Sequence, residues 1–78
     1  MKTMTCKQLG GACELEFQAE SFEKIAELSQ QHGMAMFQER DEAHLAAMDR
    51  MKELMQSPEA MARWMEEKEK EFDALPHQ

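Results

Sequence analysis

The sequence predicts an α+β fold, in which a short N-terminal antiparallel β-hairpin precedes two or three α-helices. Three observations support this prediction. The first nineteen residues alternate between apolar and polar side chains near a Gly10-Gly11 pair, later residues carry apolar side chains at steps of three and four, and Ser57-Pro58 separates two helical stretches. The 78 residues are expected to form a single domain, residues 1–78.

The hairpin is expected over about residues 2–19. Met4 and Cys6 are predicted to lie on the inner face of the first strand, because side chains two residues apart share a face. Four residues at every second position are predicted to share the inner face of the second strand: Cys13, Leu15, Phe17 and Ala19.

Two strand registers fit this hairpin. A two-residue turn at Gly10-Gly11 sets Cys6 opposite Leu15, whereas a four-residue loop over residues 8–11 sets Cys6 opposite Cys13. Both registers stay open at this point.

The first helix is predicted over about residues 21–33. Ser21 is a suitable N-cap, and Gly33 can adopt the left-handed conformation that ends many helices. The alternative is that this helix continues to Glu39 and the next one restarts at Asp41, another good N-cap.

Two further helices are predicted over about residues 35–56 and 58–75. Ser57-Pro58-Glu59 marks the start of the last helix, because serine caps, proline fits the first helical position and glutamate suits the positive end of the helix dipole. Pro76 ends it. Its apolar stripe, interrupted by Lys68, consists of Met61, Trp64, Met65, Phe72 and Leu75.

The charge balance excludes some partners. Nine Lys and Arg residues face sixteen Asp and Glu residues, so the net charge is −7, which opposes binding to a phosphate backbone. Nucleic acid is therefore not an expected partner. No stretch is apolar enough for a membrane span or a signal peptide, so a cytoplasmic location and no membrane association are expected.

Catalysis is not expected either. The sequence has no nucleophile elbow and no glycine-rich phosphate loop, and a chain this short has few residues to line a substrate pocket. The protein is therefore not expected to be an enzyme.

Cys6, Cys13 and His32 are ligand types from which zinc sites are built, provided that the hairpin packs against the first helix. In a reducing compartment the two cysteines are expected to be thiols or metal ligands and not a disulfide. Six residues separate them, whereas zinc knuckles commonly use two. The alternatives are two thiols packed in the core or a cysteine pair that acts as a redox switch.

A longer pattern surrounds these residues. Met4-Thr5-Cys6-Lys7 is followed by a glycine, by Cys13, by Ala19-Glu20-Ser21 and by a helix that is expected to close with His32-Gly33-Met34. Over about residues 1–36 this pattern resembles the family known as domain of unknown function 1059, described as small metal-binding proteins of bacteria and archaea. The resemblance implies that Cys6, Cys13 and His32 are metal ligands.

The fourth ligand stays open. Members of that family often have a further histidine five residues before the His-Gly pair, where this sequence has Glu27. Glu27 and His32 lie about 140° apart around a helix, so they do not share one face. The candidates for the fourth position are Glu27, His44, a backbone group or water. His44 can join His32 only if the chain turns between them, because twelve residues of helix span about 18 Å.

The chain contains nine methionines. Their spacing at three or four residues indicates a core stripe or an adaptable interface and not a copper(I) site. The residues in this stripe are Met48, Met51, Met55, Met61 and Met65. A homodimer is the expected partner arrangement.

Two functions follow from the sequence. The first is a small protein that binds a transition metal, zinc above all, in a structural or sensory role. The alternative is a metal-free helical homo-oligomer, or a module for binding another protein, with a methionine-rich interface.

Overall fold

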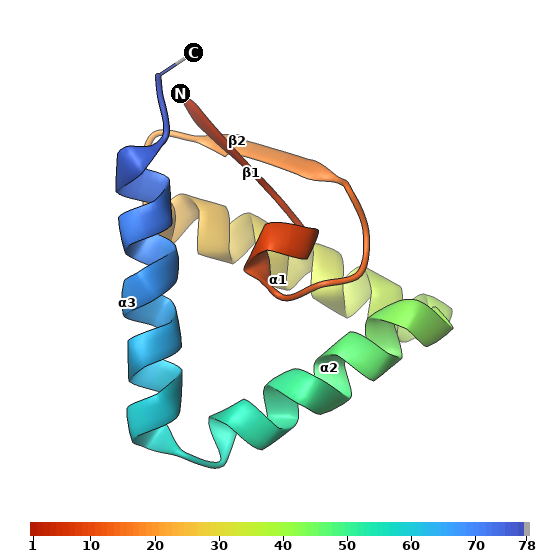
Figure 1. Cartoon of the computed structure of the whole chain (residues 1–78). Coiled ribbons are helices and arrows are strands. Elements are labelled where there is room, and N and C mark those ends of the chain that lie inside the picture. Colours follow the sequence, from red (N-terminus) through yellow and green to blue (C-terminus); the bar gives the residue numbers. More distant parts are fainter. Residues whose placement is uncertain (78) are drawn as a thin grey trace.

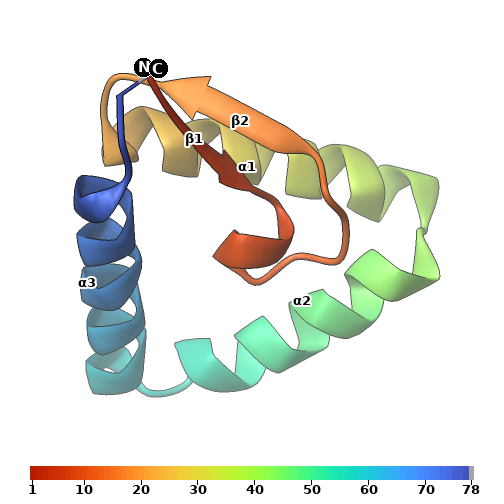
Figure 2. The same cartoon turned by 45° about the horizontal axis from the view of Figure 1, so that its top comes forward.

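The computed structural model of the protein describes residues 1–77 and confirms the α+β architecture (Figure 1). The three helices form the sides of an open frame, the two-stranded sheet lies along the first helix, and the connection between the strands fills the middle (Figure 2). The elements, in chain order, are β1 (Lys2–Thr5), the 3-10 helix η1 (Lys7–Leu9), β2 (Glu16–Ala19), α1 (Phe22–Glu39), α2 (Glu42–Met55) and α3 (Pro58–Ala74).

The strands pair in the first of the two predicted registers. Met4 lies opposite Phe17, and the amide of Cys6 donates to the carbonyl of Leu15 at 2.8 Å. The two-residue turn expected with this register is wrong, because residues 6–15 join the strands. Gly10 does not make a hairpin turn: it ends η1 in the left-handed region, with φ of 91°, and donates its amide to the carbonyl of Lys7.

The predicted inner face of the second strand is only partly correct. Phe17 and Ala19 are buried as expected, but Leu15 is 48% exposed and Cys13 lies outside β2, half-buried. The reason is that the ladder stops at Glu16, so the residues before it do not follow the alternation of the strand. The connection bends instead, and the carbonyl of Cys13 accepts the amide of Lys7 at 2.9 Å.

The predicted break at Gly33 is wrong, and so are the boundaries 21–33 and 35–56 that depended on it. Helix α1 runs through Gly33 to Glu39, as in the alternative prediction. Glycine costs only about 1 kcal/mol inside a helix, and here Gly33 leaves room for Met48 of α2, which would lie 3.9 Å from an added Cβ. The chain turns at Arg40, whose φ of 57° is left-handed.

The predicted starts of the first and last helices are confirmed by their caps. The hydroxyl oxygen of Ser21 accepts the amide of Lys24 at 3.2 Å, and that of Ser57 accepts the amide of Ala60 at 3.3 Å, with Pro58 in the first turn. Helix α3 ends at Ala74, one residue before the predicted end.

The core lies between the sheet, α1 and the end of α3, and Lys2 closes it at one edge. The ammonium group of Lys2 donates to the carbonyl of Asp73 at 2.9 Å and lies 5.0 Å from the ring centroid of Phe72. The buried apolar residues of this cluster are Met4, Cys6, Leu9, Phe17, Ala19, Ile25 and Phe72.

Helix α2 contributes little to this core. Its two buried residues are His44 and Ala47, so no large apolar side chain of α2 is fully covered. Within residues 1–77, no helix combines the length and the apolar character that crossing a membrane requires.

Candidate metal centre

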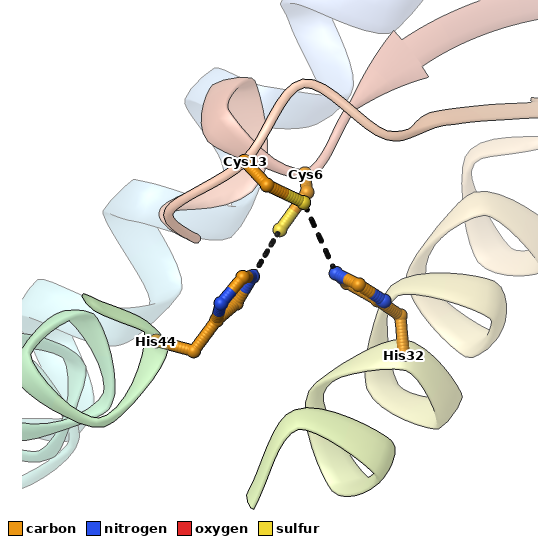
Figure 3. A group of neighbouring side chains, drawn as sticks. All are labelled: Cys6, Cys13, His32 and His44. Carbon is orange, nitrogen blue, oxygen red and sulfur yellow. Dashed lines mark hydrogen bonds between the residues drawn. The ribbon is translucent and has the colours of Figure 1, made fainter. Parts of the chain in front are cut away.

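Four potential metal ligands meet where the strand connection faces α1 and α2 (Figure 3): Cys6, Cys13, His32 and His44. The ligand atoms, one from each residue, all lie within 4.8 Å of one another. The Sγ atom of Cys13 is 3.3 Å from Nε2 of His32. The Sγ atom of Cys6 is 3.6 Å from Nε2 of His44.

These separations suit a single tetrahedral ion. Zinc binds cysteine sulfur at about 2.3 Å and histidine nitrogen at about 2.05 Å, so a tetrahedral angle sets sulfur and nitrogen about 3.6 Å apart. The two observed sulfur–nitrogen distances, 3.3 and 3.6 Å, lie close to this value. Two sulfurs and two nitrogens in a tetrahedron form a ligand set typical of zinc.

The strand connection supplies both sulfurs. Cys6 follows β1 directly, and the bond from the amide of Lys7 to the carbonyl of Cys13 brings the second cysteine back beside the first. Gly11 makes this approach possible, because an added Cβ at Gly11 would collide with Sγ of Cys6. The amide of Gly11 also donates to the carbonyl of Cys6 at 2.8 Å.

The two thiols have different acidities. Burial raises the pKa of the Cys6 thiol, although hydrogen bonds from the backbone of Cys13 and Ala12 act in the opposite direction. Burial also acts to raise the pKa of Cys13, but it is outweighed by hydrogen bonds from the backbone of Leu15 and from His44 and Cys6, so this pKa is lowered. Cys13 is therefore the more readily ionised thiol, and the thiolate is the form that binds metals.

The two histidines come from different helices. His32 lies on α1 and His44 lies in the first turns of α2, and the left-handed residue Arg40 turns the chain between them. Their ring centroids are 5.1 Å apart and the rings meet edge to face. Phe17 of β2 packs against His32, with the two ring centroids 5.8 Å apart.

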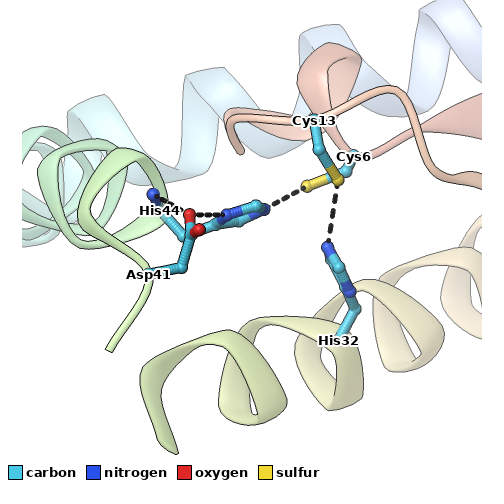
Figure 4. Close-up of polar contacts among 5 residues, drawn as sticks. All are labelled: Cys6, Cys13, His32, Asp41 and His44. Atoms are coloured by element: carbon cyan, nitrogen blue, oxygen red, sulfur yellow. Dashed lines mark hydrogen bonds and ion pairs between the residues drawn. The ribbon is translucent and has the colours of Figure 1, made fainter. Parts of the chain in front are cut away.

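Asp41 orients the ring of His44 (Figure 4). Its Oδ2 atom lies 2.6 Å from Nδ1 of His44 and also accepts the amide of His44 at 3.0 Å, which caps α2. With the proton on Nδ1, Nε2 is the nitrogen free to bind a metal, and it is the one that faces the cysteines. A carboxylate behind a ligating histidine is a common arrangement in zinc sites.

The contact between Asp41 and His44 also shifts the pKa values of both side chains. The hydrogen bond with Asp41 raises the pKa of His44, against the effect of burial, and a contact with Cys13 adds to it. The same hydrogen bond holds the pKa of Asp41 below its usual value. Asp41 is therefore ionised at neutral pH and can stabilise positive charge on the His44 ring or on an ion behind it.

A small cavity of about 110 Å³ adjoins Cys6, His32 and His44. Ala47, Met48 and Met51 form an apolar part of its wall. Apolar side chains beside a metal site limit the access of water to the ligands.

The structure brings the three predicted ligands Cys6, Cys13 and His32 together. Of the two side chains predicted as alternatives for the fourth position, His44 belongs to the cluster. Among the described residues Glu27 is not part of it: its carboxylate pairs with the ammonium group of Lys24 at 3.5 Å, and its side chain is 54% exposed.

The second role of Asp41 was not predicted from the sequence. A helix cap was expected at Asp41, but no contact with a ligand. An aspartate at an N-cap lies within reach of a side chain three residues later, so the Asp41-to-His44 spacing is the signal that points to this contact.

The fold and the cluster together define a small α+β protein with a potential two-cysteine, two-histidine metal site. In comparisons with known proteins the chain matches no family model, no curated protein and no solved structure. The resemblance to domain of unknown function 1059 stays a prediction.

Proposed function

We propose that the protein binds one zinc ion through Cys6, Cys13, His32 and His44, and that the ion has a structural role. The observation that carries this proposal is the mutual distance of the four ligand atoms, all within 4.8 Å. Four ligands from the chain complete a tetrahedron and leave no position for a substrate, as in structural zinc sites.

The weak attachment of α2 supports a structural role. The buried residues of α2 are a ligand, His44, and the small residue Ala47. An ion held by His44, by His32 of α1 and by the cysteines of the strand connection would join α2 to two segments that already share the apolar core. Metal-binding free energy would then stabilise the fold directly.

The resemblance over residues 1–36 supports the same ligands as far as it extends. It implies Cys6, Cys13 and His32. His44 lies beyond the resembling part, and its assignment rests on the geometry of this chain alone.

Metal content is the direct test. The protein is purified without a polyhistidine tag and analysed by elemental analysis and by mass spectrometry under native conditions. We expect one zinc per chain, and we expect Cys6→Ser, Cys13→Ser, His32→Ala and His44→Ala to reduce this content strongly. His77→Ala is the matched control, because His77 is an exposed histidine outside the cluster and its loss should leave the zinc in place.

Coordination geometry gives an independent readout. Cobalt(II) titrated into the metal-free protein should produce the intense visible absorption of a tetrahedral site together with sulfur-to-cobalt charge-transfer bands, and added zinc should abolish both. A protein that takes up neither ion, or ligand variants that bind as well as His77→Ala, would contradict the proposal.

A further inference from the structure

A groove between α1 and α2 exposes large apolar side chains to solvent. Met34 and Phe37 of α1 are 60% and 63% exposed, and Met55 of α2 is 58% exposed. Met48 and Met51 complete the apolar wall of this hollow, which has a volume of about 590 Å³. We infer that this methionine groove, lined by Met34, Phe37, Met48, Met51 and Met55, is the surface through which two copies of the chain form a dimer.

The composition of the groove favours burial. In a chain whose residues are 32% charged, none of the eight residues around it carries a charge. Each copy has a net charge of −7, so two copies repel each other at long range. An uncharged contact region keeps like charges out of the interface. The eight residues are Gln30, Gly33, Met34, Phe37, Gln38, Met48, Met51 and Met55.

The exposed area of the chain indicates how much surface is left to cover. The accessible surface is 5605 Å², whereas a folded monomer of 9.1 kDa exposes about 4,900 Å². The excess of about 700 Å² is close to the roughly 800 Å² that each partner buries in an interface of standard size. One further copy is therefore enough to cover it.

The shape of the molecule explains the excess. Its extents are 33 × 29 × 15 Å, so the molecule is flat, with one dimension about half as long as the other two. Domains normally bury helices between two packed layers. Two copies joined groove to groove around a two-fold axis would give α1 and α2 a layer to pack against on the face that carries the groove, and the same residues would face one another on both sides.

The rim of the groove is compatible with such a pairing. A neighbouring hollow, which shares Phe37, Met48 and Met55 with the groove, also contains Asp49 and Lys52. These opposite charges lie three residues apart on α2, so a two-fold axis can place the aspartate of each copy beside the lysine of the other. Methionine side chains adapt their shape easily, which suits a surface that meets its own copy.

The single methionine stripe predicted from spacing is divided between α2 and α3. Met61 and Met65 follow the same periodicity in the sequence but lie on α3, and they do not line the groove. Met65 is 36% exposed, which makes it a suitable control position.

Sedimentation equilibrium of the protein as purified, over concentrations from micromolar to millimolar, tests the inference. We expect the mass to rise from that of one chain to that of two. Because each substitution enters a two-fold interface twice, Phe37→Glu should raise the dissociation constant of the dimer by roughly 100-fold or more. Met65→Glu adds the same charge outside the groove and should leave the constant within about twofold of the unsubstituted protein.

Methyl resonances of the methionines locate the contact independently of any substitution. The ε-methyl signals of Met34, Met48, Met51 and Met55 should shift with protein concentration, whereas those of Met61 and Met65 should not. A mass of one chain at every concentration would overturn the inference. So would a dimer that survives Phe37→Glu while circular dichroism shows the variant folded, or one that Met65→Glu disrupts equally.

Discussion

The carboxylate of Asp41 accepts two hydrogen bonds from one residue, His44: one from the ring Nδ1 at 2.6 Å and one from the amide at 3.0 Å. A single side chain therefore begins α2 and decides which nitrogen of His44 faces the cysteines. The cap would be present in any helix with aspartate at this position, but the ring contact requires histidine three residues later.

Substitutions at Asp41 should separate these two roles. Asp41→Ser keeps an oxygen that caps α2 but removes the carboxylate behind His44, so we expect little change in helix content and a 10- to 100-fold loss of zinc affinity. Asp41→Ala removes both and should also lower the midpoint of thermal unfolding of the metal-free protein. Competition with a coloured zinc chelator measures the affinity. Equal zinc affinity in the serine variant and the original protein would contradict the role of Asp41.

Gly11→Ala should damage the metal site although it replaces none of the ligands. The new Cβ would collide with Sγ of Cys6, so the sulfur must move and the tetrahedron distorts. We expect at least roughly tenfold weaker zinc binding, in line with the loss of other groups that position ligands.

Gly33→Ala is the matched control for that change. Its Cβ would meet only the end of the Met48 side chain at 3.9 Å, and alanine is favoured over glycine inside a helix by about 1 kcal/mol. We therefore expect higher thermal stability and unchanged zinc binding. Similar losses of affinity in both alanine variants would contradict the assigned role of Gly11.

Removing the metal should loosen the fold. With free zinc about 1,000-fold above its dissociation constant, binding adds about 4 kcal/mol to the free energy of unfolding, equivalent to roughly 20 °C in a domain of this size. Trp64, the single tryptophan, packs against Gly10 of the strand connection, where an added Cβ would lie 3.4 Å from its ring. The fluorescence of Trp64 should change when a chelator removes the metal, and it should recover with added zinc but not with magnesium. In the Cys13→Ser variant the chelator should leave this fluorescence unchanged.

The pH dependence of stability should change sign with the metal. Without metal, the raised pKa of His44 makes the contact with Asp41 fully effective below about 6.5, the ordinary value, and it is lost as pH rises through the pKa in the folded protein. The lowered pKa of Asp41 sets the other limit, because the contact weakens as pH falls below about 4. Zinc requires neutral His44, so stability of the zinc form should rise with pH in the range where that of the metal-free form falls.

Thermal unfolding between pH 5 and pH 8, with excess chelator or with excess zinc, measures both slopes. Asp41→Ala should flatten the slope of the metal-free protein, because the contact that shifts the pKa of His44 is gone. Parallel slopes with and without zinc would show that His44 does not exchange a proton for the metal.

Local signals made the fold class predictable. Ser21 and Ser57-Pro58 act within four residues, so their caps could be identified from neighbouring positions alone, and both are present. The break predicted at Gly33 was wrong because a glycine has the same local signature whether it ends a helix or makes room for a side chain of another helix. Here the room is occupied by Met48, fifteen positions later.

The site was predictable only in part, for the same reason. Cys6, Cys13 and His32 stood out by residue type, but the choice between Glu27 and His44 depended on a turn at Arg40. Arginine rarely adopts the left-handed conformation found there, with φ of 57°, so Arg40 itself does not indicate this turn, and the signal for it is the candidate N-cap Asp41. The exposure of Leu15 could not be predicted either, since the alternation of apolar and polar residues does not reveal where a strand ladder stops.

The four ligand positions all precede residue 45, and none lies on α3. Helix α3 is held instead by Phe72, by the bond from Lys2 to the carbonyl of Asp73 and by half-buried contacts along its stripe. Zinc would therefore leave the molecule with two cooperative units of unequal resistance to opening. Amide hydrogen exchange in the strand connection and around His32 and His44 would slow on metal binding, while the amides of α3 would exchange at a less altered rate.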